Sequence, residues 1–237
     1  SPRVAEMTKL LENIFRSVNI ALVNELALLA ERMDIDIWEV ITAAATKPFG
    51  FMPFWPGPGV GGHCIPIDPY YLSWKAREYD VSTRFIELAA DINQSMPAHV
   101  AGLLAGALDR RGRTLSGAKV LVLGVAFKPD VDDSRHSPAE RVIALLLARG
   151  AVVTYHDPYI PELGVGGDVF HPERTVLRSR PLDEAALAEA DAVLLLTAHR
   201  VLDLERVLAT ASLVVDATRA TAGRRGPNLV RLGTAQA

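Results

Sequence analysis

KVLVLGVA, residues 119–126, is the stretch that decides the fold of this chain. Its run of Val and Leu is continuous rather than alternating, which is typical of a strand buried on both faces of a parallel sheet. Similar runs recur at 151–156, 192–197 and 212–216, and a weaker one lies near 175–178. Helical segments are expected between them, at about 138–149, 183–190 and 201–210. This order predicts an α/β fold with a doubly wound parallel sheet.

Ligands of such sheets bind outside the carboxyl ends of the strands. The polar residues that fall at or just after such ends are Lys128, Arg135, Asp157 and His199. We therefore expect a ligand site of the second half to lie among these side chains.

The first half is predicted to be helical. A long helix is expected at about 3–33, and a second helix should begin behind Asp36, which with a glutamate three residues on resembles a capping box. A loop rich in Gly and Pro follows at 49–69. A third helix should run from about 82 to 111, with a kink or a break at Pro97.

The change of pattern divides the chain into a helical central domain, residues 1–112, and a sheet domain, residues 113–237. The 237 residues are 49% hydrophobic and 22% charged, as in a globular protein. A net charge of -3 gives no reason to expect nucleic acid or an acidic membrane surface as a partner. No apolar run reaches the roughly 20 residues that span a bilayer. The single cysteine, Cys64, excludes an intrachain disulfide and fits a reducing cytoplasm.

Cys64 stands in the stretch GGHCIPIDPYYL, residues 61–72. Glycines leave the thiol open to a ligand, and Asp68 follows four residues later, which suits a covalent step followed by hydrolysis. The alternative is a buried cysteine in an ordinary Pro/Gly loop, because a free cysteine is usually a small core residue. The spacing alone leaves both interpretations open.

Three segments of the chain resemble the UDP-glucose/GDP-mannose dehydrogenase family. GGHCIPIDPYYL resembles its catalytic cysteine loop, in the form found in the branch that oxidises UDP-N-acetylhexosamines. AEMTKLLEN, residues 5–13, resembles its second catalytic segment, and FKPD (127–130) with DSRHSP (133–138) resembles its third-domain signature. The resemblance covers nearly the whole chain. It implies a helical domain that forms a homodimer, followed by a Rossmann-like domain that binds UDP-sugar.

The family's first domain, which binds NAD, is missing from this sequence. No Gly-x-Gly-x-x-Gly turn follows any of the predicted strands, and the turn after residues 119–123 has the single glycine Gly124. We therefore expect a fragment whose main NAD site lies on the missing domain and which is inactive alone.

The resemblance implies oxidation of a sugar C6 alcohol to a carboxylate with two NAD⁺. Cys64 would hold the aldehyde as a thiohemiacetal and then the acid as a thioester, and Asp68 would help to activate water. Lys9 and Asn13, spaced i, i+4 on one helix face, would stabilise the oxyanion. The alternative is that Lys9 is an ordinary solvated lysine and Asn13 an ordinary polar helix residue. The spacing alone favours this alternative, whereas the match of residues 5–13 to the family's segment argues against it.

Substrate contacts are implied for the glycine-rich loop, whose backbone could approach the sugar and the diphosphate. They comprise Phe54, Gly57, Gly59, Gly61, Gly62 and His63. An ordinary surface turn is the alternative for the glycines. His63 beside Cys64 is expected to shape specificity, and no metal site is expected because a second thiol is lacking.

Two cations of the second half receive roles from the resemblance. Lys128 matches a lysine that contacts the UDP-sugar, and Arg135 matches an arginine that reaches the cofactor pyrophosphate. Each could instead be a surface charge after a strand. Arg219 is a doubtful ligand, because it stands one residue farther from Asp216 than in the family's usual Asp-Thr-Arg. Asp157 could imitate a ribose-binding carboxylate, but the glycine turn that accompanies one is absent.

Alternatives to the acetamido-sugar enzyme remain at this point. Ile67 stands where the glucose-oxidising branch usually has lysine, which argues against a UDP-glucose 6-dehydrogenase. A non-catalytic sugar-nucleotide-binding or dimerisation module, or a different cysteine enzyme such as an acyltransferase or thioesterase, is also compatible with the residues. The nearly all-apolar stretch 18–29 favours a homodimer. The gluco and manno epimers of the substrate are not distinguished.

Overall fold

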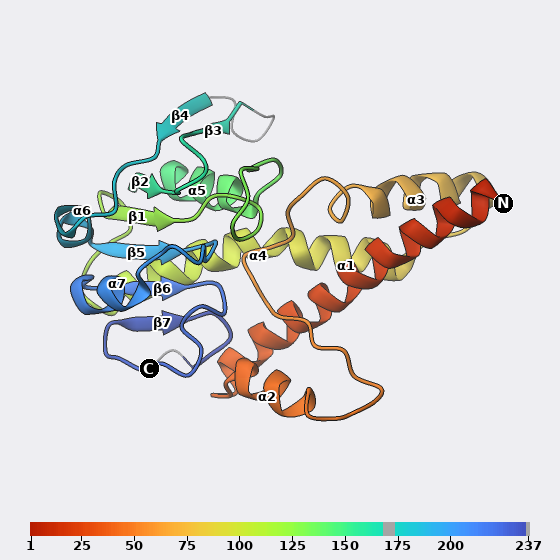
Figure 1. The fold of residues 1–237 in the computed structure, drawn as a ribbon, viewed down its shortest axis with the longest axis horizontal. Helices are drawn as coiled ribbons and strands as arrows, with labels where there is room; N and C mark the ends of the chain where they lie inside the picture. Colours follow the sequence, from red (N-terminus) through yellow and green to blue (C-terminus); the bar gives the residue numbers. More distant parts are fainter. Residues whose placement is uncertain (168–173, 236–237) are drawn as a thin grey trace.

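The computed structural model describes residues 1–167 and 174–235. Long helices form one end of the molecule and a sheet covered by helices forms the other (Figure 1). The helical elements of the first half are α1 (Pro2–Arg32), α2 (Ile37–Ala44), α3 (Asp68–Ala76), the short 3-10 helix η1 (Arg77–Tyr79) and α4 (Arg84–Asp109). No helix among the described residues is long and apolar enough to cross a membrane.

The ends of these helices follow from local chemistry, with one correction. Asp36 caps α2, because its carboxylate accepts hydrogen bonds from the backbone N–H groups of Trp38 and Glu39. Of the kink or break expected at Pro97, the break is wrong, since α4 runs through this residue without interruption. Pro97 is buried, as are Met96 and Val100 beside it, so packing compensates for the hydrogen bond that proline cannot make.

The predicted doubly wound parallel sheet is confirmed. Its strands lie in the order β2-β1-β5-β6-β7 and all pair in parallel. The strands are β1 (Lys119–Leu123), β2 (Val152–His156), β5 (Ala192–Leu195), β6 (Val214–Asp216) and β7 (Leu229–Arg231). The helices are α5 (Pro138–Ala148), α6 (Glu184–Glu189) and α7 (Leu204–Thr210).

Two parts of the sheet half differ from the expectation. The weak strand near 175–178 is β4 (Arg174–Arg178), and it pairs antiparallel with β3 (Glu162–Gly166) in a separate hairpin. β3 and β7 were not anticipated, because neither carries the long Val/Leu run of the central strands. The hairpin projects beside β2 at the edge of the sheet (Figure 1).

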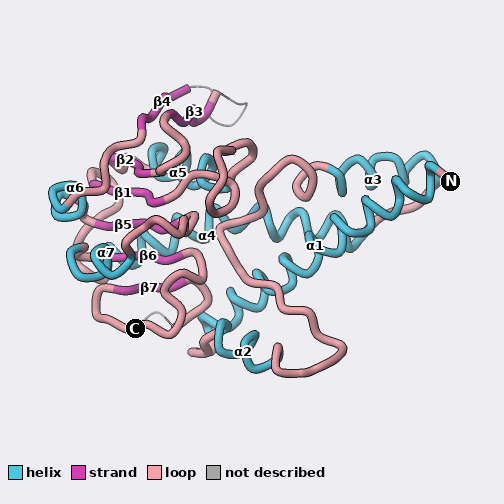
Figure 2. Tube along the Cα trace, viewed as in Figure 1, coloured by secondary structure: helices cyan, strands magenta, loops and turns pink. Residues whose placement is uncertain are grey.

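Both faces of β1 are buried, as its sequence predicts. Val120 and Val122 belong to the core shared with α4 and α5, whereas Leu121 and Leu123 belong to the core shared with α6 and α7. Because side chains alternate along a strand, one apolar run supplies both cores. Helices therefore cover the sheet on its two faces (Figure 2).

β1 ends at Leu123, three residues before the predicted end, because Gly124 turns the chain away. Gly124 has a φ of +75°, and a Cβ there would lie 2.0 Å from the carbonyl oxygen of Thr197. The neighbours of β1 are β2 on one side and β5 on the other. The loop after β1 thus leaves the sheet at its topological switch point, where open α/β sheets bind ligands.

The helical and sheet halves are joined by more than the chain connection. Val100, Leu104 and Leu108 of α4 are buried in the same core as α5. The C-terminal segment returns to the helices, where the Leu232 carbonyl accepts a 2.7 Å hydrogen bond from the Trp38 indole. The division at residues 112 and 113 stays a prediction.

Candidate active site

A pocket of about 440 Å³ opens at the carboxyl ends of β1, β5 and β6. Its walls come from the three loops that follow these strands and from the glycine-rich loop of the first half. The lining residues include Pro58, Gly59, Phe127, Lys128, Thr197 and Arg219. Both halves of the molecule therefore contribute to one site, at the position where a sheet of this kind binds ligands.

Two cations line this pocket, and aromatic rings support both. The Lys128 ammonium lies 5.3 Å from the centroid of the Phe127 ring. The Arg219 guanidinium lies 3.7 Å from the Trp55 ring centroid, which is close stacking. Such a pair of cations suits an anionic ligand such as a diphosphate. Arg219, which the sequence disfavours, thus lies in the pocket together with the predicted Lys128.

The loop that carries Arg219 is shaped by Asp216, the last residue of β6. Its buried carboxylate accepts 2.7 Å hydrogen bonds from the backbone N–H and the hydroxyl of Thr218. The backbone N–H of Thr221 donates a further bond of 2.9 Å. Burial raises the pKa of Asp216, although these bonds oppose the rise. The side chain of Asp216 is therefore occupied by its own loop and leaves Arg219 to face a ligand.

Like Asp216, Asp157 uses its carboxylate for hydrogen bonds within the protein. One carboxylate oxygen accepts hydrogen bonds from the backbone N–H groups of Val125 (2.7 Å) and Ala126 (3.0 Å), and from the ring of His199 (3.0 Å). Burial alone would raise the pKa of Asp157, but these bonds outweigh it and lower the pKa to about 2. Asp157 is 3% exposed and supports the loop after β1 from within the fold.

The sheet does not offer the features of a dinucleotide site. The space beside Gly124 is filled by Thr197, so no pyrophosphate could approach the turn after β1. The carboxylate of Asp157, which could otherwise face a ribose, is turned to backbone N–H groups. The described residues therefore do not fit the main site of NAD.

The glycine-rich loop docks against the sheet half through its glycines. A Cβ on Gly61 would lie 2.9 Å from the carbonyl oxygen of His136, and one on Gly62 would lie 3.1 Å from the Phe127 ring. A Cβ on Gly59 would lie 3.3 Å from Pro138. These glycines allow two segments of backbone to meet, which packing requires whether or not a ligand is bound.

The start of this loop is tied to the helices. The backbone N–H of Gly57 donates a 3.0 Å hydrogen bond to the side chain of Asn24, which is fully buried in α1. Asn24 in turn donates to Asn93 of α4. Phe54 packs edge-to-face on Phe15, with ring centroids 5.6 Å apart. Asn24 was missed in the sequence, where a polar residue within an apolar helical run is the available signal.

Cys64 is exposed in the turn that leads into α3. Its carbonyl accepts a 2.8 Å hydrogen bond from the backbone N–H of Asp68, so the two residues share one turn. The Asp68 carboxylate accepts a 2.6 Å bond from the side chain of Asn13, which is fully buried. Lys9 is exposed and lies 3.8 Å from Glu12. The structure thus brings Cys64, Asp68 and Asn13 together and leaves Lys9 at the surface.

His63 connects the cysteine loop to the loop after β1. Its Nε2 lies 3.0 Å from the Asp133 carboxylate, and its ring contacts Phe127 edge-on. Asp133 also accepts hydrogen bonds of 3.0 and 2.9 Å from the Arg135 guanidinium, which holds the pKa of Asp133 below its usual range. Arg135 is therefore held by Asp133, with its side chain largely exposed. Among the described residues, no His, Cys, Asp and Glu side chains cluster as a metal site would require.

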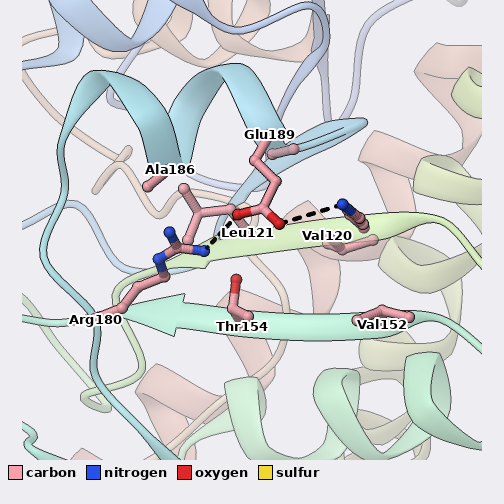
Figure 3. Close-up of a pocket in the computed structure, with 9 residues that line it drawn as sticks. Val120, Leu121, Val152, Thr154, Arg180, Ala186 and Glu189 are labelled. Carbon is pink, nitrogen blue, oxygen red and sulfur yellow. Dashed lines mark hydrogen bonds and ion pairs between the residues drawn. The ribbon is translucent and has the colours of Figure 1, made fainter.

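A second hollow, of about 60 Å³, lies at the opposite end of β1. Figure 3 shows Glu189 facing Arg180 across it. The Glu189 carboxylate lies 3.2 Å from the Lys119 ammonium and 3.3 Å from the Arg180 guanidinium. The single carboxylate of Glu189 therefore pairs with both cations of this hollow.

Comparison with known proteins gives the family. The central-domain model of the UDP-glucose/GDP-mannose dehydrogenase family matches residues 3–95, and the model of its UDP-binding domain matches residues 121–222. The chain belongs to the UDP-glucose/GDP-mannose dehydrogenase family. The resemblance drawn from the three sequence segments is thereby confirmed, with the two models matching in the order the segments indicate.

The relatives of this family member include enzymes for acetamido sugars. A UDP-N-acetyl-D-mannosamine dehydrogenase of Pyrococcus horikoshii is 45% identical over 66% of this chain and 36% of its own length. A UDP-N-acetyl-D-glucosamine 6-dehydrogenase of Pseudomonas aeruginosa is 41% identical over 68% of this chain and 37% of its own. A solved UDP-D-ManNAc dehydrogenase structure from P. horikoshii aligns with a TM-score of 0.82 and 33% identity, covering 97% of this chain and 52% of that one. The aligned segments thus cover 36% and 37% of the length of these two curated relatives and 52% of the solved structure.

Proposed function

We propose that this chain supplies the central and UDP-sugar-binding parts of an NAD-dependent UDP-N-acetylhexosamine 6-dehydrogenase. The observation that carries the proposal is the pocket in which Lys128 and Arg219 face the same space, walled by the loop that leads to Cys64. The names of its relatives, which act on UDP-N-acetylmannosamine and UDP-N-acetylglucosamine, support an acetamido sugar. NAD⁺ would take up the hydride removed from C6, at a site whose main part lies outside the described residues.

The diphosphate is the part of the substrate that the pocket suits best. Lys128 and Arg219 would contact its oxygens, and the backbone of the glycine-rich loop around Gly57 and Gly59 would approach the sugar. His63 would limit which sugars reach Cys64, because it precedes Cys64 in the chain and its ring packs on Phe127, which lines the pocket. Arg135 would face the cofactor pyrophosphate only after its bonds to Asp133 rearrange.

Cys64 is the proposed nucleophile. Its thiolate would add to C6 of the sugar aldehyde, forming a carbon–sulfur bond while the carbonyl electron pair moves to oxygen. Lys9 and Asn13 would stabilise the negative oxygen. Lys9 is exposed and would have to turn toward a bound sugar, whereas Asn13 already donates to Asp68. Loss of a second hydride from C6 of this adduct, to a second NAD⁺, would give a thioester.

Asp68 would act in the hydrolytic step. Its carboxylate would accept a proton from the water that attacks the thioester carbon, and the Cys64 thiolate would leave as the carboxylate product forms. The 2.6 Å bond from Asn13 fixes the orientation of Asp68 for this task. An exposed single cysteine with this chemistry is suited to a reducing cytoplasm.

Alkylation of Cys64 tests the site. Because the chain has one cysteine, iodoacetamide labelling reports on this residue alone. We expect a saturating UDP-N-acetylhexosamine to slow the labelling and uridine at the same concentration to leave it unchanged. An unchanged labelling rate with every UDP-sugar, each shown to bind, would remove Cys64 from the substrate site.

A homodimer through α1 belongs to the same proposal. α1 exposes large apolar side chains along its length, among them Leu11, Phe15, Leu22, Leu26 and Leu29. A monomer would leave this apolar stripe in water, which favours its burial against a second copy.

A further inference from the structure

The buried pair of Asp157 and His199 has no part in the chemistry proposed above. Both side chains are 0% exposed, and the His199 Nε2 lies 3.0 Å from the Asp157 carboxylate. Asp157 follows β2 and His199 follows β5, so the pair spans the switch point on either side of β1. A buried charge is costly unless hydrogen bonds satisfy it, so its partners indicate what the pair supports.

The backbone groups that hydrogen-bond to Asp157 and His199 lie on both sides of Lys128 in the sequence. Asp157 accepts hydrogen bonds from the backbone N–H groups of Val125 and Ala126. His199 Nδ1 accepts a 2.9 Å bond from the backbone N–H of Asp130. The loop is therefore fixed two residues before Lys128 and two residues after it.

The protonation of His199 is set by the same contacts. Because Nδ1 accepts from the Asp130 N–H, it carries no proton, and Nε2 must carry the proton that it donates to Asp157. Asp130 is bound in addition by the backbone N–H of Arg200, at 2.9 Å. The loops after β1 and β5, which follow neighbouring strands and both line the pocket, are thus linked to each other.

We propose that His199 and Asp157 are positioning residues that set the place of Lys128 in the diphosphate pocket. A lysine side chain is long and flexible, so the backbone at its base decides which part of the pocket the ammonium can reach. The inference rests on the proposed function, in which Lys128 contacts the diphosphate. A merely structural pair would stabilise the fold without this selective effect on ligand affinity.

A double-mutant cycle separates the two roles. UDP is titrated calorimetrically into the chain, into His199→Gln, into Lys128→Met and into the double variant, and thermal unfolding of each is recorded in parallel. The glutamine keeps a donor for Asp157 but withdraws the acceptor for the Asp130 N–H. We expect His199→Gln to weaken UDP binding about five- to tenfold, and to have no effect on affinity in the Lys128→Met background. His199→Asn, whose oxygen can replace Nδ1 as the acceptor, should recover most of the affinity.

The outcomes are distinguishable. An equal loss of affinity from His199→Gln in both backgrounds would overturn the positioning role while leaving the proposed function intact. Unchanged UDP affinity in Lys128→Met alone, or no binding by the unsubstituted chain, would overturn the assignment of Lys128 and the inference with it. If His199→Gln unfolds, the cycle is run with His199→Asn, for which the expected coupling to Lys128 is smaller but still present.

Discussion

Three aspartates near the pocket hydrogen-bond to the backbone of the surrounding loops. Asp157 and Asp216 end or follow strands, and Asp130 lies in the loop after β1. Each carboxylate accepts backbone N–H groups, from Val125 and Ala126, from Thr218 and Thr221, and from Arg200. These carboxylates are therefore satisfied by hydrogen bonds within the protein, and the pocket cations Lys128 and Arg219 remain available to an anionic ligand.

Asn13 is expected to matter for stability as well as for chemistry. Asn13→Ala removes a buried hydrogen bond to the Asp68 carboxylate and should lower the free energy of unfolding by about 1.5–3 kcal/mol. Lys9→Ala, on the same helix face but exposed, should change it by less than about 0.5 kcal/mol. Urea unfolding of the two variants measures the difference. Equal effects would show that the Asn13–Asp68 bond contributes nothing to the fold.

Asp157 should give the protein a distinct acid sensitivity. Its pKa is about 2 in the folded chain, below its ordinary value of 3.8, so the ionised form stabilises the fold at pH values above 4. This contribution, about 2 kcal/mol, should disappear as the pH falls from about 4 to 2. In Asp157→Asn the contribution is missing, so the gap between the two unfolding free energies should narrow over this range. A gap that stays constant from pH 5 to 2.5 would contradict the assigned pKa.

The glycine-rich loop is the element that joins the cysteine to the diphosphate pocket. Gly61→Ala would place a methyl group 2.9 Å from the His136 carbonyl and from Pro138, so the loop must shift. We expect a loss of about 1–3 kcal/mol in unfolding free energy, together with weaker UDP-sugar binding.

A glycine in open space provides the matched control for this loop. Gly102, within α4, has no atom within 4 Å of an added Cβ. Gly102→Ala should therefore raise the free energy of unfolding by about 0.5–1 kcal/mol and leave binding unchanged. If Gly61→Ala behaves like Gly102→Ala, the loop does not depend on its contact with the sheet half.

The elements that could be predicted from the sequence are those whose formation is determined by residues close together in the chain. The central strands β1 and β5 carry uninterrupted apolar runs, and the Asp36 cap is a local motif, so both were foreseeable. β7 has three half-buried residues and is a strand because it pairs with β6. No local sequence pattern predicts this pairing. The predicted break at Pro97, the alternative to a kink, is wrong because burial of α4 against its neighbours outweighs the local cost of proline.

The same distinction applies to the site. Cys64, Asp68, Asn13 and Lys128 stand in motifs and could be singled out from the sequence. Arg219 could not, because its position over Trp55 depends on side-chain bonds of Asp216 that fold the intervening loop. The pairing of Asp157 with His199 likewise joins residues 42 positions apart.

At the scale of the whole molecule, α4 and the C-terminal segment hold the halves in one arrangement. The far end of α4 lies in the core of the sheet half, while Leu232 and Gly233 bind Trp38 and Glu31 of the helical half. The pocket between the halves is thereby fixed before a ligand arrives. The apolar stripe of α1 is one of the surfaces that this arrangement leaves exposed.

Charges on this stripe should disrupt the proposed dimer. We expect the unsubstituted chain to sediment with twice the mass of one chain, and Leu22→Asp combined with Leu26→Asp to sediment as a monomer. Val176→Asp, which is equally exposed but lies in β4, should leave the mass unchanged. Sedimentation equilibrium gives these masses directly. A clean monomer of the unsubstituted chain at micromolar concentration would refute the dimer.

Calorimetric titration with four sugar nucleotides tests the central claim most directly. UDP-N-acetylmannosamine, UDP-N-acetylglucosamine, UDP-glucose and GDP-mannose are compared on the unsubstituted chain and on Arg219→Gln. The account predicts that one acetamido sugar nucleotide binds most tightly and that Arg219→Gln weakens this binding about tenfold or more. Binding of GDP-mannose as tight as that of either acetamido sugar, or affinities unaffected by Arg219→Gln, would contradict it.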